Sequence, residues 1–147
     1  MNAPFETIPF LTTYQPALLA LAILALTVLI QSVLIVPLAF LTGKQAPGML
    51  VNGSHDDFSF RVVRTYLNAT ENLPAFAATV FLAIIAGVDQ DWVNWLAGLH
   101  VGFRMIFWMA YYSGIGRVAF GPRTFSYVGG VLANIILAGM TVYALIT

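Results

Sequence analysis

The chain has 147 residues, of which 60% are hydrophobic and only 8% are charged, and its formal net charge is zero. Because a soluble domain of this length carries roughly a quarter charged residues, this composition excludes an ordinary soluble domain and predicts an integral membrane protein. The zero net charge argues against a nucleic-acid partner, and the absence of cysteine excludes disulfides, thiolate metal sites and a cysteine nucleophile.

Four long apolar segments predict four membrane-spanning helices in a single domain over residues 1–147. The first segment, at about 14–41, is long enough at roughly 1.5 Å per residue to cross a hydrocarbon core of ~30 Å. No Lys or Arg precedes it, which argues against a cleaved signal peptide. The others lie at about 60–87, 92–113 and 125–146, with Ser59 as the expected N-cap of the second and Pro74 as an expected kink in it. Short connections predict an all-α, antiparallel four-helix bundle.

The distribution of cations predicts an orientation. Lys44, Arg61 and Arg64 flank the first connection, and Arg117 and Arg123 lie in the third. The positive-inside rule therefore places these connections in the cytoplasm and both termini outside. The lack of cysteine and the small size favour a bacterial inner membrane.

The second segment carries a polar stripe. Arg61, Arg64, Asn68 and Glu71 follow one another at steps of three, four and three, so at about 100° per residue they share one face of a helix. An ionisable residue at membrane depth costs at least a few kcal/mol and normally faces the protein interior. We therefore expect this face to line the bundle.

The third segment carries a second polar face, formed by His100, Arg104 and Tyr111. Arg104 is the deep cation and Glu71 the deep carboxylate, so we expect them to pair. Such a pair can be a structural clamp between helices. A clamp, however, leaves a cluster of arginines with too few acids, and that excess indicates an anionic ligand.

The two histidines carry weaker signals. His100 is expected to be a satisfied histidine within the bundle, and no further His or Cys is placed to complete a metal site, so none is predicted. His55, which precedes Asp56 and Asp57, is expected to lie in a solvated loop.

The polar stripe also resembles a known family signature. The run Arg61-x-x-Arg64-x-x-x-Asn68-x-x-Glu71-Asn72-x-Pro74 resembles the second helix of the MAPEG family, the membrane-associated proteins in eicosanoid and glutathione metabolism. Arg104, Tyr111 and the segment Gly121-Pro122-Arg123 are similar to that family's third helix and third loop.

The resemblance implies a homotrimer that binds glutathione between adjacent subunits near the cytoplasmic face. It implies that Arg64 and Asn68 hold the backbone and carboxylates of the tripeptide, with Arg61 in the same cationic set, and that Glu71 meets its ammonium group or an arginine. Tyr111 would add a hydroxyl and Arg104 a charge at the floor of the site. The arginine that stabilises the thiolate would be Arg123, or else Arg117.

The implied activity is that of a microsomal-type glutathione S-transferase or peroxidase, in which the thiolate attacks a hydrophobic electrophile or a lipid substrate. Two alternatives stay open. The chain can be a family member that kept the bundle without the chemistry, as a structural or lipid-binding protein. It can also be a small transporter subunit, although the first and fourth segments lack the ionisable residues expected along a transport path.

Overall fold

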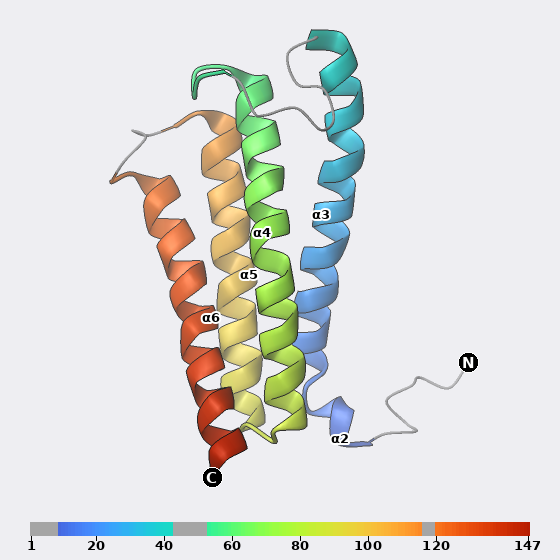
Figure 1. Cartoon of the computed structure of the whole chain (residues 1–147), viewed down its shortest axis with the longest axis vertical. Coiled ribbons are helices and arrows are strands. Elements are labelled where there is room, and N and C mark those ends of the chain that lie inside the picture. The colour runs from blue at the N-terminus through green and yellow to red at the C-terminus, as the bar shows by residue number, and fades with distance from the viewer. Residues whose placement is uncertain (1–8, 43–52, 116–119) are drawn as a thin grey trace, which may run out of the picture.

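A computed structural model describes residues 9–42, 53–115 and 120–147, and within these ranges the chain is helical with no strand. Figure 1 shows the long helices side by side, with the short helix α2 (Pro9–Thr12) near the end of the bundle where the chain ends. The helices are α2 (Pro9–Thr12), α3 (Gln15–Thr42), α4 (Phe58–Ile85), α5 (Gln90–Ser113) and α6 (Pro122–Ile146). The all-α prediction is confirmed for the described residues.

Three of the long helices contain segments long and apolar enough to cross a membrane, namely Gln15–Leu38, Phe58–Ile85 and Pro122–Ile146. The remaining long helix, α5, has 24 residues and packs against α3, α4 and α6. Its hydropathy is lower because it carries polar residues, and two of these, His100 and Arg104, are buried within the bundle.

Local signals explain where the helices begin and end. Asp57 is the N-cap of α4, because its side chain accepts hydrogen bonds from the Ser59 amide (3.0 Å) and hydroxyl (2.9 Å). The expectation that Ser59 caps this helix is therefore wrong; Ser59 already lies in the first turn. Gly114 ends α5 with φ 70°, a left-handed conformation that glycine adopts without strain. Pro74 lies inside α4, which continues past it.

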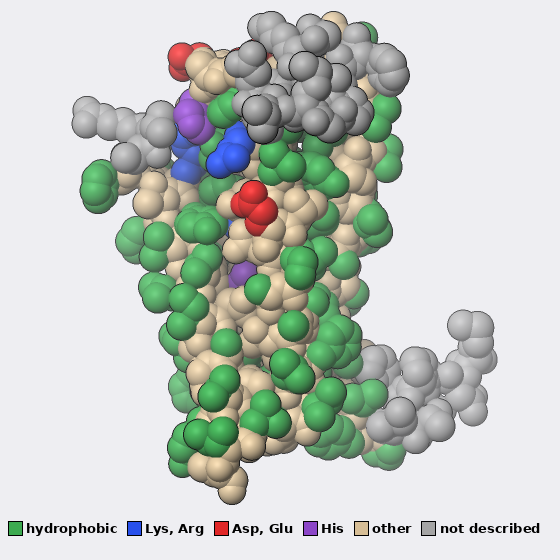
Figure 2. All heavy atoms as spheres, viewed as in Figure 1, with side chains coloured by type: hydrophobic (Ala, Val, Ile, Leu, Met, Phe, Trp, Pro, Cys, Tyr) green, Lys and Arg blue, Asp and Glu red, His purple; other side chains and the backbone are tan. Residues whose placement is uncertain are grey.

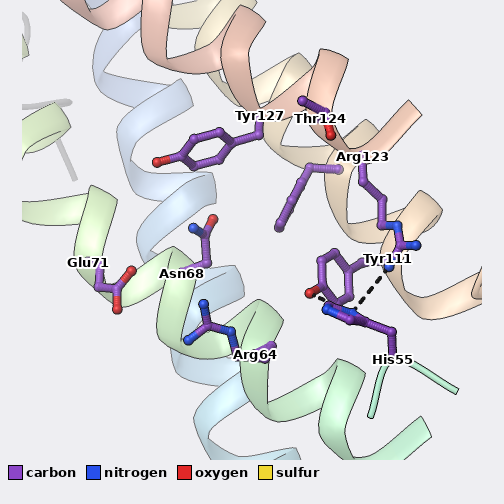
Figure 3. Close-up of a pocket in the computed structure, with 9 residues that line it drawn as sticks. His55, Arg64, Asn68, Glu71, Tyr111, Arg123, Thr124 and Tyr127 are labelled. Carbon is purple, nitrogen blue, oxygen red and sulfur yellow. Dashed lines mark hydrogen bonds between the residues drawn. The ribbon is translucent and has the colours of Figure 1, made fainter. Parts of the chain in front are cut away.

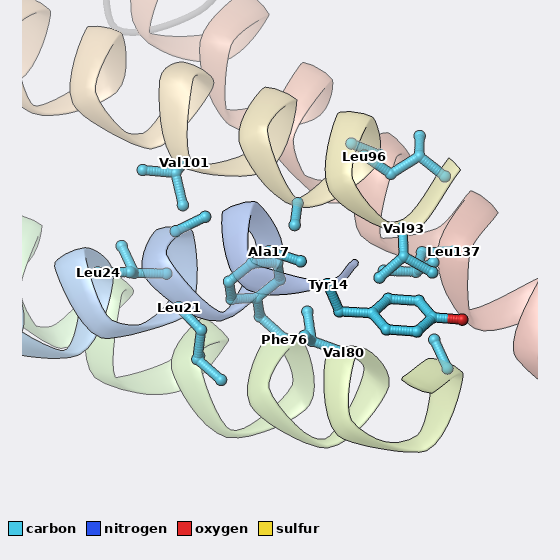
Figure 4. Packing of buried hydrophobic residues seen from close by; sticks show 14 of the residues in the cluster. Tyr14, Ala17, Leu21, Leu24, Phe76, Val80, Val93, Leu96, Val101 and Leu137 are labelled. Carbon is cyan, nitrogen blue, oxygen red and sulfur yellow. The ribbon is translucent and has the colours of Figure 1, made fainter. Parts of the chain in front are cut away.

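The apolar core extends along the bundle, from Tyr14 and Val88 at the end where α3 begins to Phe107, Trp108 and Tyr111 near the end of α5. Figure 4 shows side chains from all four long helices meeting there, among them Leu24, Phe76, Val93 and Leu137. Close approach of α5 and α6 requires a small residue, because a Cβ atom on Gly129 would lie 2.7 Å from the Phe103 ring. Large apolar side chains on the outer faces of the helices are exposed, as expected for surfaces that meet lipid.

Two polar side chains, which make three hydrogen bonds, tie the start of α3 to the end of the bundle where α4 ends and α5 begins. The Tyr14 hydroxyl donates to the Val88 carbonyl (2.7 Å) in the turn between α4 and α5. The Asn94 side chain donates to the Thr13 carbonyl (2.8 Å) and accepts from the Ala17 amide (3.1 Å). These contacts fix the start of α3 against the other helices. A group of polar side chains from several helices lies at the opposite end of the bundle.

Candidate functional site

A pocket of ≈ 380 Å³ lies at the end of the bundle where α4 and α6 begin and α5 ends. Figure 2 shows basic and histidine side chains gathered near this end, with a carboxylate farther along the same, otherwise largely apolar face. Side chains from α4, α5, α6 and the turn before α4 point toward the pocket in Figure 3. The lining residues are His55, Arg64, Asn68, Glu71, Phe107, Tyr111, Arg123, Thr124 and Tyr127.

Helix α4 supplies one wall of the pocket. Arg64, Asn68 and Glu71 line it together, as steps of four and three on a single helix face allow. Arg64 and Glu71 are exposed in the single chain, whereas Asn68 is half-buried. The buried Oδ1 atom of Asn68 has no hydrogen-bond partner within the described residues. This wall therefore presents a cation, an amide and a carboxylate to whatever enters.

The opposite wall holds a compact cluster of Tyr111, Arg123 and His55. The Arg123 guanidinium carbon lies 5.0 Å from the centre of the Tyr111 ring, and Arg123 is only 6% exposed although it lies in the first turn of α6. The His55 Nδ1 atom is 3.1 Å from the Tyr111 hydroxyl and 3.4 Å from Arg123 Nη1. A guanidinium held beside a phenol in a pocket wall is suited to stabilise a developing anion.

His55 reaches the pocket because Arg61 holds the turn before α4. Arg61 Nη1 donates to the carbonyls of His55 (2.8 Å) and Asp56 (2.9 Å), and the Phe60 ring packs edge-on against the imidazole, with centroids 5.1 Å apart. The expectation that His55 is a solvated loop residue is therefore wrong. Arg61, in turn, does not line the pocket but supports the turn. No sequence signal indicated this contact, because spacing alone does not show that Arg61 hydrogen-bonds the carbonyl of a residue six positions earlier.

The environment of His55 disfavours its charged form. Partial burial lowers the pKa of the imidazole first, and the nearby positive charges of Arg123, Arg64 and Arg61 lower it further, against a smaller upward effect of Asp56. His55 is therefore neutral at pH 7.

Arg104 lies deeper in the bundle and does not line the pocket. It is 1% exposed, its guanidinium carbon is 4.9 Å from the centre of the Phe107 ring, and its Nη1 and Nη2 atoms have no hydrogen-bond partner within the described residues. The expected ion pair with Glu71 is thus not formed in the described part of the chain, because Glu71 points to the exposed side of α4 while Arg104 points inward.

His100 lies within the bundle, as expected, but it is not fully satisfied, because its buried Nε2 atom has no hydrogen-bond partner within the described residues. Its Nδ1 donates to the Gly130 carbonyl (2.8 Å), and its ring stacks on Phe76 with centroids 4.1 Å apart. Among the described residues no group of three His, Cys, Asp or Glu side chains is arranged to hold a metal ion. Lys44 and Arg117, which the sequence analysis placed in the connections, lie outside the described residues.

Comparison with known proteins identifies one family. The MAPEG family model matches residues 17–143, which cover most of the chain and all the residues that line the pocket. The resemblance seen in the second and third helices is thereby confirmed. None of the curated proteins compared with the chain matches it.

Proposed function

The chain belongs to the MAPEG family, and from this membership we propose that it is a membrane-bound glutathione-dependent transferase or peroxidase that acts on hydrophobic electrophiles. The family includes glutathione transferases and peroxidases as well as other members. The observation that carries the proposal is the pocket, which gathers Arg64, Asn68, Glu71, Tyr111 and Arg123 from three helices.

The charges of the pocket suit glutathione. The tripeptide carries two carboxylates, one ammonium group and a thiol, and the pocket offers two guanidinium groups and one carboxylate. In this proposal Arg64 and Asn68 bind the carboxylates and backbone, Glu71 binds the ammonium group, and Tyr111 contributes a hydroxyl to the site. Charge-assisted hydrogen bonds of this kind are roughly twice as strong as neutral ones, so they supply both affinity and orientation.

Arg123 supplies the chemistry in this proposal. A guanidinium beside a thiol favours the thiolate and lowers the thiol pKa from roughly 8.5–9 toward neutrality. The proton passes to solvent, and the sulfur then attacks an electrophilic carbon. A carbon–sulfur bond forms while the leaving group departs with its bonding electron pair. In this proposal an apolar electrophile reaches the pocket from the lipid.

We further propose that all four long helices cross the membrane and that the pocket end faces the cytoplasm. The 24 residues of α5 are long enough to span, and its buried polar residues explain its lower hydropathy. Arg61, Arg64 and Arg123 cluster at the pocket end, whereas Asp89 and Asp91 lie at the other, which supports cytoplasmic placement, with both termini outside, by the positive-inside rule. A bacterial inner membrane fits this arrangement.

A homotrimer would complete the site. Glu71 and Arg64 are exposed on α4, a helix apolar enough to cross the membrane, and a charged group facing lipid costs several kcal/mol. A neighbouring subunit packed against this side of α4 would cover both charges and close the pocket.

The test separates binding from thiol activation. Purified protein is titrated calorimetrically with glutathione, and the ultraviolet absorbance of the bound thiolate is followed against pH, alongside turnover of a generic aryl halide. Arg64→Ala should lose binding, because its carboxylate partner is charged in ground and transition states alike. Arg123→Ala should retain most binding but lose thiolate absorbance and turnover, because its partner becomes charged only on ionisation.

The matched control ligand is S-methylglutathione, which should bind with no thiolate signal. An absence of glutathione binding, or of bound thiolate near neutral pH in the wild type, would refute the proposal. If Arg117→Ala rather than Arg123→Ala raises the thiol pKa, the activating arginine is Arg117.

A further inference from the structure

Among the described residues that line the pocket, His55 alone comes from outside the long helices, and its contacts give it a defined role. Its Nδ1 atom faces two hydrogen-bond donors on two different helices, the hydroxyl of Tyr111 on α5 (3.1 Å) and Nη1 of Arg123 on α6 (3.4 Å). Figure 3 shows the imidazole against both side chains. The imidazole therefore bridges the two residues that form this wall of the pocket.

The chemistry of these partners decides the protonation state of His55. A guanidinium carries only N–H donors, so Nδ1 can accept from Arg123 only when it bears no proton. The neutral imidazole must then carry its proton on Nε2. Protonation of Nδ1 would set an N–H group against the N–H of Arg123 and place two positive charges side by side.

We propose that His55 is the positioning residue of the thiolate site: its unprotonated Nδ1 holds the Arg123 guanidinium beside the Tyr111 hydroxyl, and protonation of His55 releases this arrangement. This inference rests on the proposed glutathione chemistry and deepens it. Arg123 remains the group that meets sulfur, while His55 acts through Arg123. The site thereby becomes sensitive to pH through a residue that acts on Arg123 rather than on the sulfur.

The charges around His55 favour the neutral form of its imidazole near pH 7. The facing groups are Arg123 on α6, Tyr111 on α5, Arg61 and Arg64 on α4, and Asp56 in the same turn. Among the described residues three cations oppose one carboxylate, and partial burial acts in the same direction as the cations. The transition of the imidazole therefore falls on the acid side of its ordinary value of 6.5.

Two substitutions separate the hydrogen-bond role of His55 from its packing role. In His55→Asn the amide oxygen is the same number of bonds from the backbone as Nδ1 of the imidazole. The asparagine therefore keeps the acceptor but cannot be protonated. His55→Phe keeps an aromatic ring against Phe60 but has no acceptor. The matched control is Ser54→Ala in the same turn, which removes only the acceptor for the Asp56 amide (3.3 Å).

The first readout is the titration of bound glutathione. In His55→Phe the bound thiol pKa should rise by about one unit, a tenfold loss of thiolate at pH values below it, with glutathione affinity changed less than threefold. His55→Asn should keep the wild-type thiol pKa, and its kcat/KM should fall less steeply below pH 6.5. Ser54→Ala should match the wild type throughout. Equal thiol pKa values in His55→Phe and the wild type, or in His55→Phe and His55→Asn, would overturn the proposal.

The second readout needs no glutathione. The chain has two histidines, so the imidazole ¹⁵N signals of the ligand-free protein can be assigned by the loss of one set in His55→Asn. His55 should titrate below pH 6.5 with an unprotonated Nδ1, and Arg123→Gln should move its midpoint upward. An unmoved midpoint would overturn the contact. If the wild type binds no glutathione, the proposed function and the thiol role of His55 both fail, whereas this titration still reports on the contact itself.

Discussion

Asn94 on α5 is a side chain whose removal should have a measurable and specific cost. Its Oδ1 accepts from the Ala17 amide (3.1 Å) and its Nδ2 donates to the Thr13 carbonyl (2.8 Å). Ala17 lies in the first turn of α3, where backbone amides have no partner within their own helix. Asn94 therefore caps α3 from a neighbouring helix.

The magnitude follows from these two bonds. Each net hydrogen bond contributes about 1 kcal/mol, the loss of an N-cap side chain costs about 0.5–2 kcal/mol, and hydrogen bonds between membrane helices average about 0.6 kcal/mol. Asn94→Ala should therefore lower the free energy of unfolding by about 1–2 kcal/mol. Asn94→Asp should cost less, because it keeps the acceptor at a helix N-terminus, where a negative charge is favourable, and loses only the donor.

The assay is unfolding of the purified protein in mixed micelles with a rising fraction of a denaturing detergent. The matched control is Asn72→Ala, because within the described residues the Asn72 side chain donates to the Asn68 carbonyl of its own helix (2.7 Å) and not to another helix. Both alanine substitutions gain the same helix propensity, so the difference between them isolates the contact between helices. Equal unfolding midpoints for Asn94→Ala and Asn72→Ala would refute the reasoning.

Three further predictions use the same assay. Gly129→Ala should destabilise the protein by about 1–3 kcal/mol, because the added Cβ atom would lie 2.7 Å from the Phe103 ring. Gly139→Ala should stabilise it by about 0.5–1 kcal/mol, because nothing lies within 4 Å of the added Cβ atom. The reverse order would contradict the packing of α5 on α6. Folding lowers the pKa of His55, so the contribution of the neutral imidazole to stability is complete above the unfolded pKa of 6.5 and is lost as pH falls through the folded pKa. Between pH 7 and pH 5 the wild type should therefore lose more stability than His55→Asn. Tyr14→Phe should cost about 1–3 kcal/mol, because it leaves a buried carbonyl without its donor, and an unchanged midpoint would show that water replaces the hydroxyl.

The sequence predicted the helices more readily than their caps. Apolar length is the dominant signal for helices in lipid, and the second segment, predicted at about 60–87, is observed as Phe58–Ile85. The N-cap of that helix was misplaced at Ser59 because Asp57 and Ser59 are both good caps, and only the backbone conformation at Asp57 decides between them. Hydropathy also underrates α5, since it counts buried polar residues as if they met lipid.

The site was predictable only as far as helical periodicity reaches. The spacing of Arg64, Asn68 and Glu71 places them on one face, and the structure shows them lining one pocket. Periodicity does not give the rotation of one helix relative to another. The predicted pair of Glu71 with Arg104 depends on how α4 and α5 are rotated relative to each other. In the structure Arg104 packs against the Phe107 ring instead. His55 was missed for a related reason, because no period describes a turn.

The role of Arg61 connects these points and explains how a turn residue can belong to a rigid site. Arg61 lies on the first turn of α4, and its guanidinium donates hydrogen bonds to the carbonyls of His55 and Asp56. The turn is thereby held from the same helix that carries Arg64, and His55 is delivered to residues on α5 and α6. Because each carbonyl hydrogen bond from a charged donor contributes about 1.5–3 kcal/mol, Arg61 can hold the turn in place without touching a ligand. The sequence predicts Arg61 as part of a ligand-binding stripe, but in the structure Arg61 holds the turn that carries His55. The position of His55 in the pocket wall therefore depends on Arg61.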